Sequence, residues 1–261
     1  MEYHKNMDKY ESYDITDEQW KVIEPLMPPE YTGKKGRPRK DNRTMVNGIL
    51  WINRSGAQWK QLPEKYGPWQ SIYARFAKWR DNGVLEKIFA KLSKDADTEN
   101  YSIDSTCAKV HQSANGGEKN ENKAVGRTKG GINTKIHAIV DGLGNPVAFL
   151  LSPGNDGDST HAIDLMKKID IEGSNVLGDK AYGTKEILAY INEHGADVVI
   201  PPKSNTKEPW EVDYCLYKER HLVECFFQKI KWFRRIATRY DKLDKSFLSF
   251  VYMAACMIWL L

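Results

Sequence analysis

The chain has 261 residues, of which 41% are hydrophobic and 28% are charged, and its net charge is +4. This composition is that of a soluble globular protein, and the length allows one large domain or two smaller ones. The polar opening of the chain has no export-signal pattern, and the four cysteines have neither CxxC spacing nor the spacing of a disulfide framework. We therefore expect a cytoplasmic protein with reduced thiols.

The first third of the chain predicts short helices around a dense aromatic core. Capping residues over 14–18 precede an apolar series that stops at Pro28-Pro29. Met45, Ile49 and Leu50 then recur at helical spacing, and a further helix is predicted over 84–92. We expect residues 1–97 to form a helical, DNA-binding domain. A helix-turn-helix that enters the major groove is one interpretation, and a helical scaffold without groove contact is the other.

After a polar boundary at residues 94–100, the apolar periodicity changes to that of an α/β domain. Three strands, a helix, a strand, a helix, a strand and a helical end follow in that order. This is also the strand order of the ribonuclease-H-like fold, a mixed five-stranded sheet with helices, which we expect over residues 98–261. The pattern by itself would also fit other α/β domains. The predicted strands are 101–106, 132–140, 147–151, 175–178 and 197–200, and the predicted helices are 162–169, 185–193, 216–232 and 246–261.

The last of these segments, residues 246–261, is the longest apolar stretch of the chain. It is shorter than the roughly 20 residues that a membrane helix needs. We therefore interpret it as a buried terminal helix and expect no membrane partner.

Three carboxylates lie where a metal site could form. Asp104 is in the first predicted strand, Asp179 follows the fourth, and Glu224 is in the late helix. Phosphodiester chemistry uses two divalent ions about 4 Å apart, and such ions take carboxylate oxygens from different elements. We expect the three to converge on shared metal positions. For each alone, a turn or capping role is the alternative.

The late helix also carries a polar stripe. Tyr217, Arg220, Glu224 and Lys231 fall on roughly one face at 3.6 residues per turn, while apolar residues cover much of the remaining surface. The stripe is therefore expected to border a cleft, with one acid between two cations. A solvated face of an amphipathic helix is the alternative.

The spacing Tyr217-x2-Arg220-x3-Glu224-x6-Lys231 resembles the signature of bacterial DDE transposases of the insertion-sequence-four and insertion-sequence-five superfamily, in its insertion-sequence-five group. The resemblance covers nearly the whole chain. Matching segments are Ile103 to Thr106 (IDST), Gly130 to His137 (GGINTKIH), Leu177 to Gly183 (LGDKAYG), Gly36 to Arg39 (GRPR) and Ser55 to Trp59 (SGAQW). Gly183 departs from the pattern, since many members have an acid there; this leaves the triad intact.

The resemblance implies a ribonuclease-H-like enzyme that performs two-metal phosphoryl transfer on DNA. Asp104, Asp179 and Glu224 would bind Mg2+, with Mn2+ as a substitute. Arg220 and Lys231 would contact DNA, with Tyr217 beside them. The partners implied are double-stranded DNA, as terminal inverted repeats and as target, and a second copy of the chain, in a homodimer or larger assembly on paired ends. The place of action implied is the bacterial nucleoid.

Two strongly basic segments, 34–43 and 229–245, favour a polyanionic partner. In the first, Arg37, Arg39 and Lys40 resemble the core of an AT-hook, with a flexible basic linker as the alternative. In the second, Arg234 and Arg235 are candidate phosphate contacts. Arg127 and Lys129 lie in a Gly-, Asn- and Lys-rich stretch that we expect to be a loop ordered on DNA.

We therefore expect an insertion-sequence transposase that cuts and pastes DNA. Two alternatives remain. One is a nuclease of the same fold without strand transfer. The other is an inactive relic that regulates by occupying DNA ends.

Overall fold

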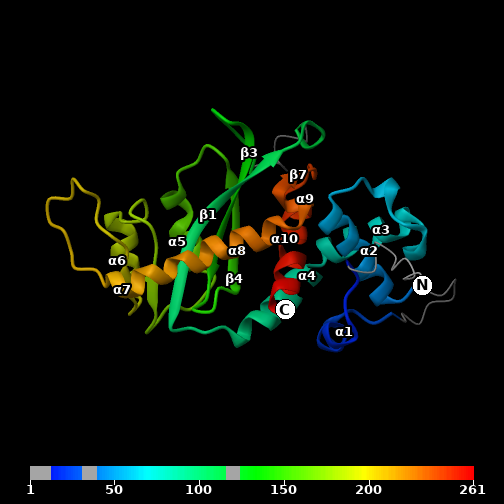
Figure 1. Cartoon of the computed structure of the whole chain (residues 1–261), viewed down its shortest axis with the longest axis horizontal. Helices are drawn as coiled ribbons and strands as arrows, with labels where there is room; N and C mark the ends of the chain where they lie inside the picture. Colours follow the sequence, from blue (N-terminus) through cyan, green and yellow to red (C-terminus); the bar gives the residue numbers. More distant parts are fainter. Residues whose placement is uncertain (1–12, 31–39, 116–123) are drawn as a thin grey trace, which may run out of the picture.

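A mixed β-sheet forms the centre of the part of the molecule that begins at about residue 100 (Figure 1). The structure, a computed structural model, describes residues 13–30, 40–115 and 124–261. Within them, five strands lie in the order β4-β3-β1-β5-β6, and the short strands β2 and β7 pair with β3 and β1. The strands are β1 (Asn100–Val110), β2 (Gly126–Thr128), β3 (Gly131–Val140), β4 (Pro146–Pro153), β5 (Asn175–Leu177), β6 (Asp197–Val199) and β7 (Thr238–Arg239).

Strand directions confirm the predicted ribonuclease-H-like fold. β1 is antiparallel to β3, and β3 to β4, while β1, β5 and β6 run parallel. The helices are α1 (Asp17–Ile23), α2 (Asn42–Ser55), α3 (Trp69–Asp81), α4 (Val84–Leu92), α5 (Ala162–Met166), α6 (Lys185–Glu193), α7 (Tyr214–Tyr217), α8 (His221–Lys231), α9 (Arg234–Ala237) and α10 (Asp244–Trp259). The 3-10 turns are η2 (Glu24–Leu26), η3 (Trp59–Gln61), η4 (Glu64–Tyr66), η5 (Ser93–Asp95), η6 (Gln112–Ala114), η7 (Asp158–His161) and η8 (Lys218–Arg220).

The two faces of the sheet pack against different helices, because side chains alternate along a strand. Ala108, Ile136 and Phe149 join the core that contains α8 and α10. Ile103 and Ile139 face the opposite way and pack with residues of α5 and α6. Asp104 therefore belongs, by alternation, to the face of β1 that α8 covers.

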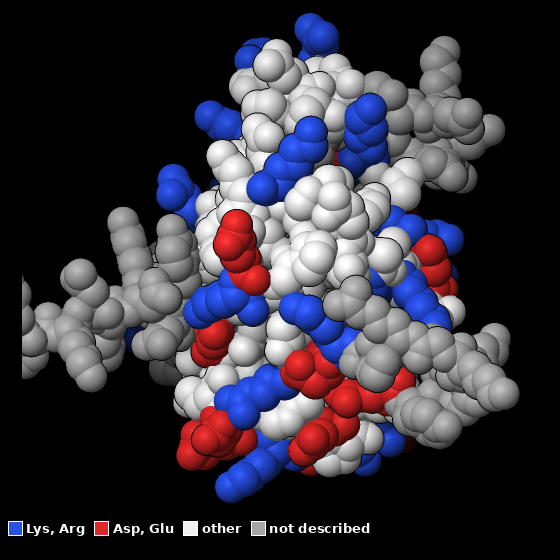
Figure 2. All heavy atoms as spheres, turned by 90° about the vertical axis from the view of Figure 1, so that its right-hand side faces the viewer, with Lys and Arg blue, Asp and Glu red and all other residues white. Residues whose placement is uncertain are grey.

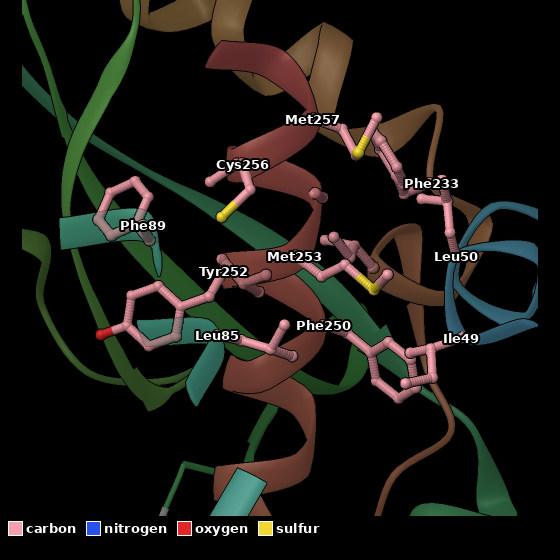
Figure 3. Close-up of a cluster of buried hydrophobic side chains, with 14 of the residues drawn as sticks. Ile49, Leu50, Leu85, Phe89, Phe233, Phe250, Tyr252, Met253, Cys256 and Met257 are labelled. Carbon is pink, nitrogen blue, oxygen red and sulfur yellow. The ribbon is translucent and has the colours of Figure 1, made fainter. Parts of the chain in front are cut away.

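The helix α10 lies between the sheet and the N-terminal helices (Figures 1 and 3). Figure 3 shows Tyr252 and Cys256 on the side of Phe89, and Met257 on the side of Phe233. Both sides of α10 are buried in one core that also includes α2, α3 and α4. The prediction of a buried terminal helix is confirmed, and no helix within the described residues is long and apolar enough to cross a membrane.

Phe250 tests how strongly α10 joins these parts. Its ring is fully buried and stacks on Phe76 with centroids 4.5 Å apart. Phe250→Ala should lower the free energy of unfolding by about 3–5 kcal/mol, through lost apolar burial and a residual cavity. Urea denaturation measures this, with Leu143→Ala at an exposed site as the control. Equal effects of the two changes would contradict the central role of α10.

Candidate active site

The first strand and the β5 end place two aspartates at the same level of the sheet. β1 and β5 run parallel with Ser102 opposite Leu177, so Asp104 and Asp179 each come two residues later. The Asp104 carboxylate accepts a hydrogen bond from the Ser105 amide at 2.7 Å, and that of Asp179 accepts one from the Ala181 amide at 2.8 Å. Both side chains are partly buried.

The helix α8 adds the third carboxylate. Within α8, Val223 and Phe226 lie on the inner face and are fully buried, whereas Glu224 lies on the outer face with its side chain 52% exposed. The predicted helix over 216–232 is broken here: η8 separates α7 from α8. The Asn100 amide at the start of β1 donates to Glu219 of η8 at 3.2 Å, which ties η8 to the strand.

Arg220 joins two of the three carboxylates. Its guanidinium donates to Asp104 at 3.1 Å and to Glu224 in a very short contact one helical turn away. It also lies 5.9 Å from the centroid of the Tyr217 ring. Three members of the predicted polar stripe are thus brought together around Asp104.

The environment of Asp104 is electrostatically costly. Burial raises the pKa of the Asp104 carboxyl above its ordinary value. The charges of Asp179 and Asp158 raise this pKa further, while the Ser105 amide and Arg220 oppose them. A carboxylate in this position favours a cationic neighbour, and Arg220 supplies one.

Sequence reasoning missed a network behind Asp104, on the other face of β1. The helix predicted over 162–169 is shorter than expected and follows the 3-10 turn η7, which begins at Asp158. Asp158 accepts hydrogen bonds from Ser105 and, at 2.8 Å, from Lys135. Lys135 also donates to the Asp156 carbonyl at 2.6 Å. Only the alternation of β3 could have placed Lys135 on that face, and nothing local pairs it with Asp158.

Tyr182 is the second residue missed. It is 1% exposed, and its hydroxyl has no hydrogen-bond partner within the part of the chain that the structure describes. Burial raises the pKa of Tyr182, and Asp104, Asp158 and Asp179 raise it further. A buried hydroxyl normally finds a partner, so this one points to a group that enters among the aspartates.

The three carboxylates are not arranged as a preformed metal-binding site. Within residues 13–30, 40–115 and 124–261, no three His, Cys, Asp or Glu side chains lie close enough together to hold a metal ion. The expected convergence on shared positions is therefore not present in this conformation, since Arg220 stands between Asp104 and Glu224.

Comparisons with known proteins now decide the family. Residues 15–89 match the family model "Putative transposase of IS4/5 family", and residues 96–209 and 176–261 match two models of the "Transposase DDE domain". A Brucella ovis protein described as "Putative transposase for insertion sequence element IS6501" is 38% identical over 132 residues, which are 49% of this chain and 99% of that protein. The chain belongs to the IS4/IS5 family of DDE transposases. An uncharacterized protein of Sinorhizobium fredii is also 38% identical, over 40% of this chain and 83% of its own length.

A solved structure supports the fold. The cryo-EM structure of a piggyBac transposase synaptic complex with hairpin DNA has a TM-score of 0.54 and 9% identity, over 97% of this chain and 71% of that one. This likeness concerns the fold of the transposase. Transposase DDE domains use divalent metal ions, which agrees with the carboxylate character of the site.

The predicted DNA contacts of the transposase divide into exposed and buried groups. Arg127, Lys129, Lys231 and Arg234 are exposed, while exposed Lys40 donates to the Tyr66 carbonyl at 3.1 Å. The predicted contacts Arg37 and Arg39 lie outside the described residues. Figure 2 shows Lys and Arg over the upper part of one face and acidic residues gathered at its lower end.

The expectation for Arg235 is wrong, because its side chain is buried. Its Nε and Nη2 donate to the two carboxylate oxygens of Asp241, each at 2.9 Å, and its Nη1 donates to the Ala57 carbonyl at 3.2 Å. Arg239 is likewise buried and pairs with Asp244 at 2.7 Å. Both arginines are therefore buried in ion pairs within the chain and are not exposed at the surface.

A histidine near the site makes stability depend on pH. Burial, followed by the neighbouring His161, lowers the pKa of His137 to about 4. In the unfolded chain, His137 has its ordinary pKa of about 6.5. Between pH 6.5 and about pH 4 the unfolded chain therefore binds a proton at His137 that the folded protein does not bind. Stability should fall as pH drops from about 6.5 to 4, by about 3 kcal/mol.

Urea denaturation across that window measures the effect. His137→Gln should flatten the slope, because glutamine has no proton to gain. An unchanged slope in the variant would show that other groups cause the dependence.

Proposed function

We propose that this transposase binds terminal inverted repeats, frees a 3′-hydroxyl at each end and joins it to target DNA. Asp104, Asp179 and Glu224 hold two divalent ions, Mg2+ or, as a substitute, Mn2+. The observation that carries the proposal is the bridge of Arg220 between Asp104 and Glu224, beside Asp179. One cation there already neutralises carboxylates from two distant elements.

The residues fit a divalent ion. The donor set is carboxylate oxygen, which Mg2+ prefers. Burial raises the pKa of the Asp104 carboxyl, and the charges of Asp179 and Asp158 add to this effect, so a further cation would stabilise the ionised form. The Tyr182 hydroxyl is buried without a hydrogen-bond partner among the described residues. Bound ions would neutralise the reacting phosphate and make a water or 3′-hydroxyl nucleophilic.

The chain's own groups then have separate tasks. Arg220 leaves the carboxylates and holds a phosphate, for which its forked guanidinium is suited. Lys231, seven residues after Glu224 on the same stripe, holds a further phosphate. The Asp158–Lys135 pair and the Ser105 hydroxyl keep β1 in place from behind. The Tyr182 hydroxyl donates to an oxygen that enters among the aspartates.

Residues 1–97 and 98–261 divide the work in this proposal, with the helical part recognising DNA and the ribonuclease-H-like part cutting it. The exposed cations Arg127, Lys129, Arg234 and Lys40 support binding to the phosphate backbone. Arg37 and Arg39, which lie outside the described residues, have the same role in this proposal on the basis of the sequence alone. Two copies hold paired ends, and the enzyme works on DNA of the bacterial nucleoid.

A second candidate is an inactive relic that occupies DNA ends. The absence of a three-acid cage within the described residues favours it. The two are separated by incubating the full chain with a labelled, pre-cut fragment of the DNA that flanks its gene, a target plasmid and Mg2+ or Mn2+. Metal-dependent joining supports the transposase, cleavage without joining indicates a nuclease, and binding alone indicates the regulator.

A further inference from the structure

A cavity of about 260 Å3 lies where the ends of α2, α8 and α10 meet. Tyr13, Arg54, Lys229, Trp232, Phe233 and Arg234 line it. The end of α10 closes it with apolar side chains, and Figure 3 shows one of them, Met257, next to Phe233. None of the residues assigned to the active site above lies in this cavity.

Arg54 makes the cavity unusual. Its guanidinium lies 5.1 Å from the centroid of the Phe233 ring and 5.9 Å from that of Tyr13. Burial lowers the pKa of Arg54, and its Nε is buried with no hydrogen-bond partner in the described part of the chain. A half-buried guanidinium between two rings, whose buried Nε has no hydrogen-bond partner among the described residues, favours an anion.

The surroundings specify the kind of anion. Lys229 and Arg234 add two exposed cations, and no Asp or Glu side chain is among the described lining residues. Trp232, the C-cap residue just after α8, has 75% of its surface exposed, although large aromatic side chains are usually buried. Cations beside an exposed ring form the combination that binds a phosphate and stacks on a base.

We propose that this cavity binds one unpaired nucleotide of DNA, with the phosphate on Arg54, Lys229 and Arg234 and the base against Trp232. The base must be unpaired, because a base within a duplex is stacked on both faces and cannot enter a cavity. Sites for drug-sized ligands have volumes of about 300–1,000 Å3. The cavity is slightly smaller than these, and its size suits a single flat ring.

The position relates the cavity to the active site, and this step rests on the proposed function. Trp232 follows Glu224 by eight residues along α8, which is about 12 Å at 1.5 Å per residue. At about 3.4 Å per nucleotide, a strand held at Glu224 reaches the cavity within about four nucleotides. The cavity would therefore hold a strand that has separated from its partner close to the cut.

The test compares two DNA probes with the full-length protein at one salt concentration. One is a fully paired duplex, and the other is the same duplex with a single unpaired thymidine. Fluorescence anisotropy gives both affinities for wild type, Trp232→Leu and Arg54→Gln, with Tyr190→Leu on α6 as the aromatic control. Because Trp232 is exposed, its replacement should leave folding intact, which thermal melting verifies.

We expect Trp232→Leu to weaken binding of the unpaired probe by about 5- to 100-fold, the size of one base-stacking contact, and to leave the paired duplex nearly unchanged. If Trp232→Leu weakened binding of both probes equally, the cavity would contact only the DNA backbone and not an unpaired base. No change for either would assign the cavity to a protein segment. Both results overturn the inference, whereas failure of wild type to bind any DNA would overturn the proposed function too.

Discussion

Asp104→Asn should abolish DNA cleavage, with the rate falling at least about 1,000-fold, or about 4 kcal/mol of transition-state stabilisation. Asparagine keeps the shape of the side chain and removes the charge that a divalent ion requires. The change should not unfold the protein, because it also removes repulsion from Asp179 and Asp158. Nicking of plasmid DNA in Mg2+ measures the rate, and thermal melting measures stability.

The companion measurement is Mn2+ binding to the DNA-free protein, followed by electron paramagnetic resonance. Asp104→Asn should weaken this binding, whereas Asp164→Asn, at an exposed site on α5, should not. If the Asp104→Asn protein still cleaved DNA and still bound Mn2+, Asp104 would not be a metal ligand.

Arg220→Gln should separate metal binding from cleavage. If Arg220 moves from the carboxylates to a phosphate, its loss should lower cleavage by about 100- to 1,000-fold, the effect of removing one group that stabilises the transition state. Mn2+ binding should be retained or strengthened, because Asp104 and Glu224 lose their competing cation. Arg220→Lys should recover part of the cleavage, since it restores charge without the forked geometry.

The same two assays decide this prediction. Loss of both cleavage and Mn2+ binding in Arg220→Gln would mean that Arg220 only holds the carboxylates in place. Unchanged cleavage would mean that it has no part in the reaction.

Most of the fold followed from apolar periodicity. The helix α6 begins and ends as predicted, and each of the five central strands overlaps the range predicted for it. The differences between the predicted and observed elements come from contacts between distant parts of the chain. β1 extends to Val110 because it pairs with β3 over a long register, which the sequence of β1 alone does not reveal. The predicted late helix breaks at η8, where Asn100 binds Glu219, a contact between residues 119 positions apart.

The candidate site was only partly predictable for the same reason. Spacing on one helix revealed Arg220 and Glu224, and the strand order placed Asp104 near Asp179. Asp158 and Tyr182 carry no spacing signal, because they meet the site through tertiary contacts. The basic run that contains Arg235 shows the converse: charge predicted a surface, and packing placed this arginine in an ion pair with Asp241. The roles of the predicted ligands remain predictions.

The central claim is that the carboxylates of strand β1, the β5 end and helix α8 cut DNA together. The most direct test is nicking of a supercoiled plasmid that carries the DNA flanking this gene, in Mg2+ or Mn2+, by wild type and Glu224→Gln. Glu211→Gln, which removes an exposed acid outside the site, is the matched control. We predict metal-dependent nicks at defined ends for wild type and Glu211→Gln and none for Glu224→Gln; equal nicking by Glu224→Gln, or none by wild type while it still binds these ends, would contradict the account.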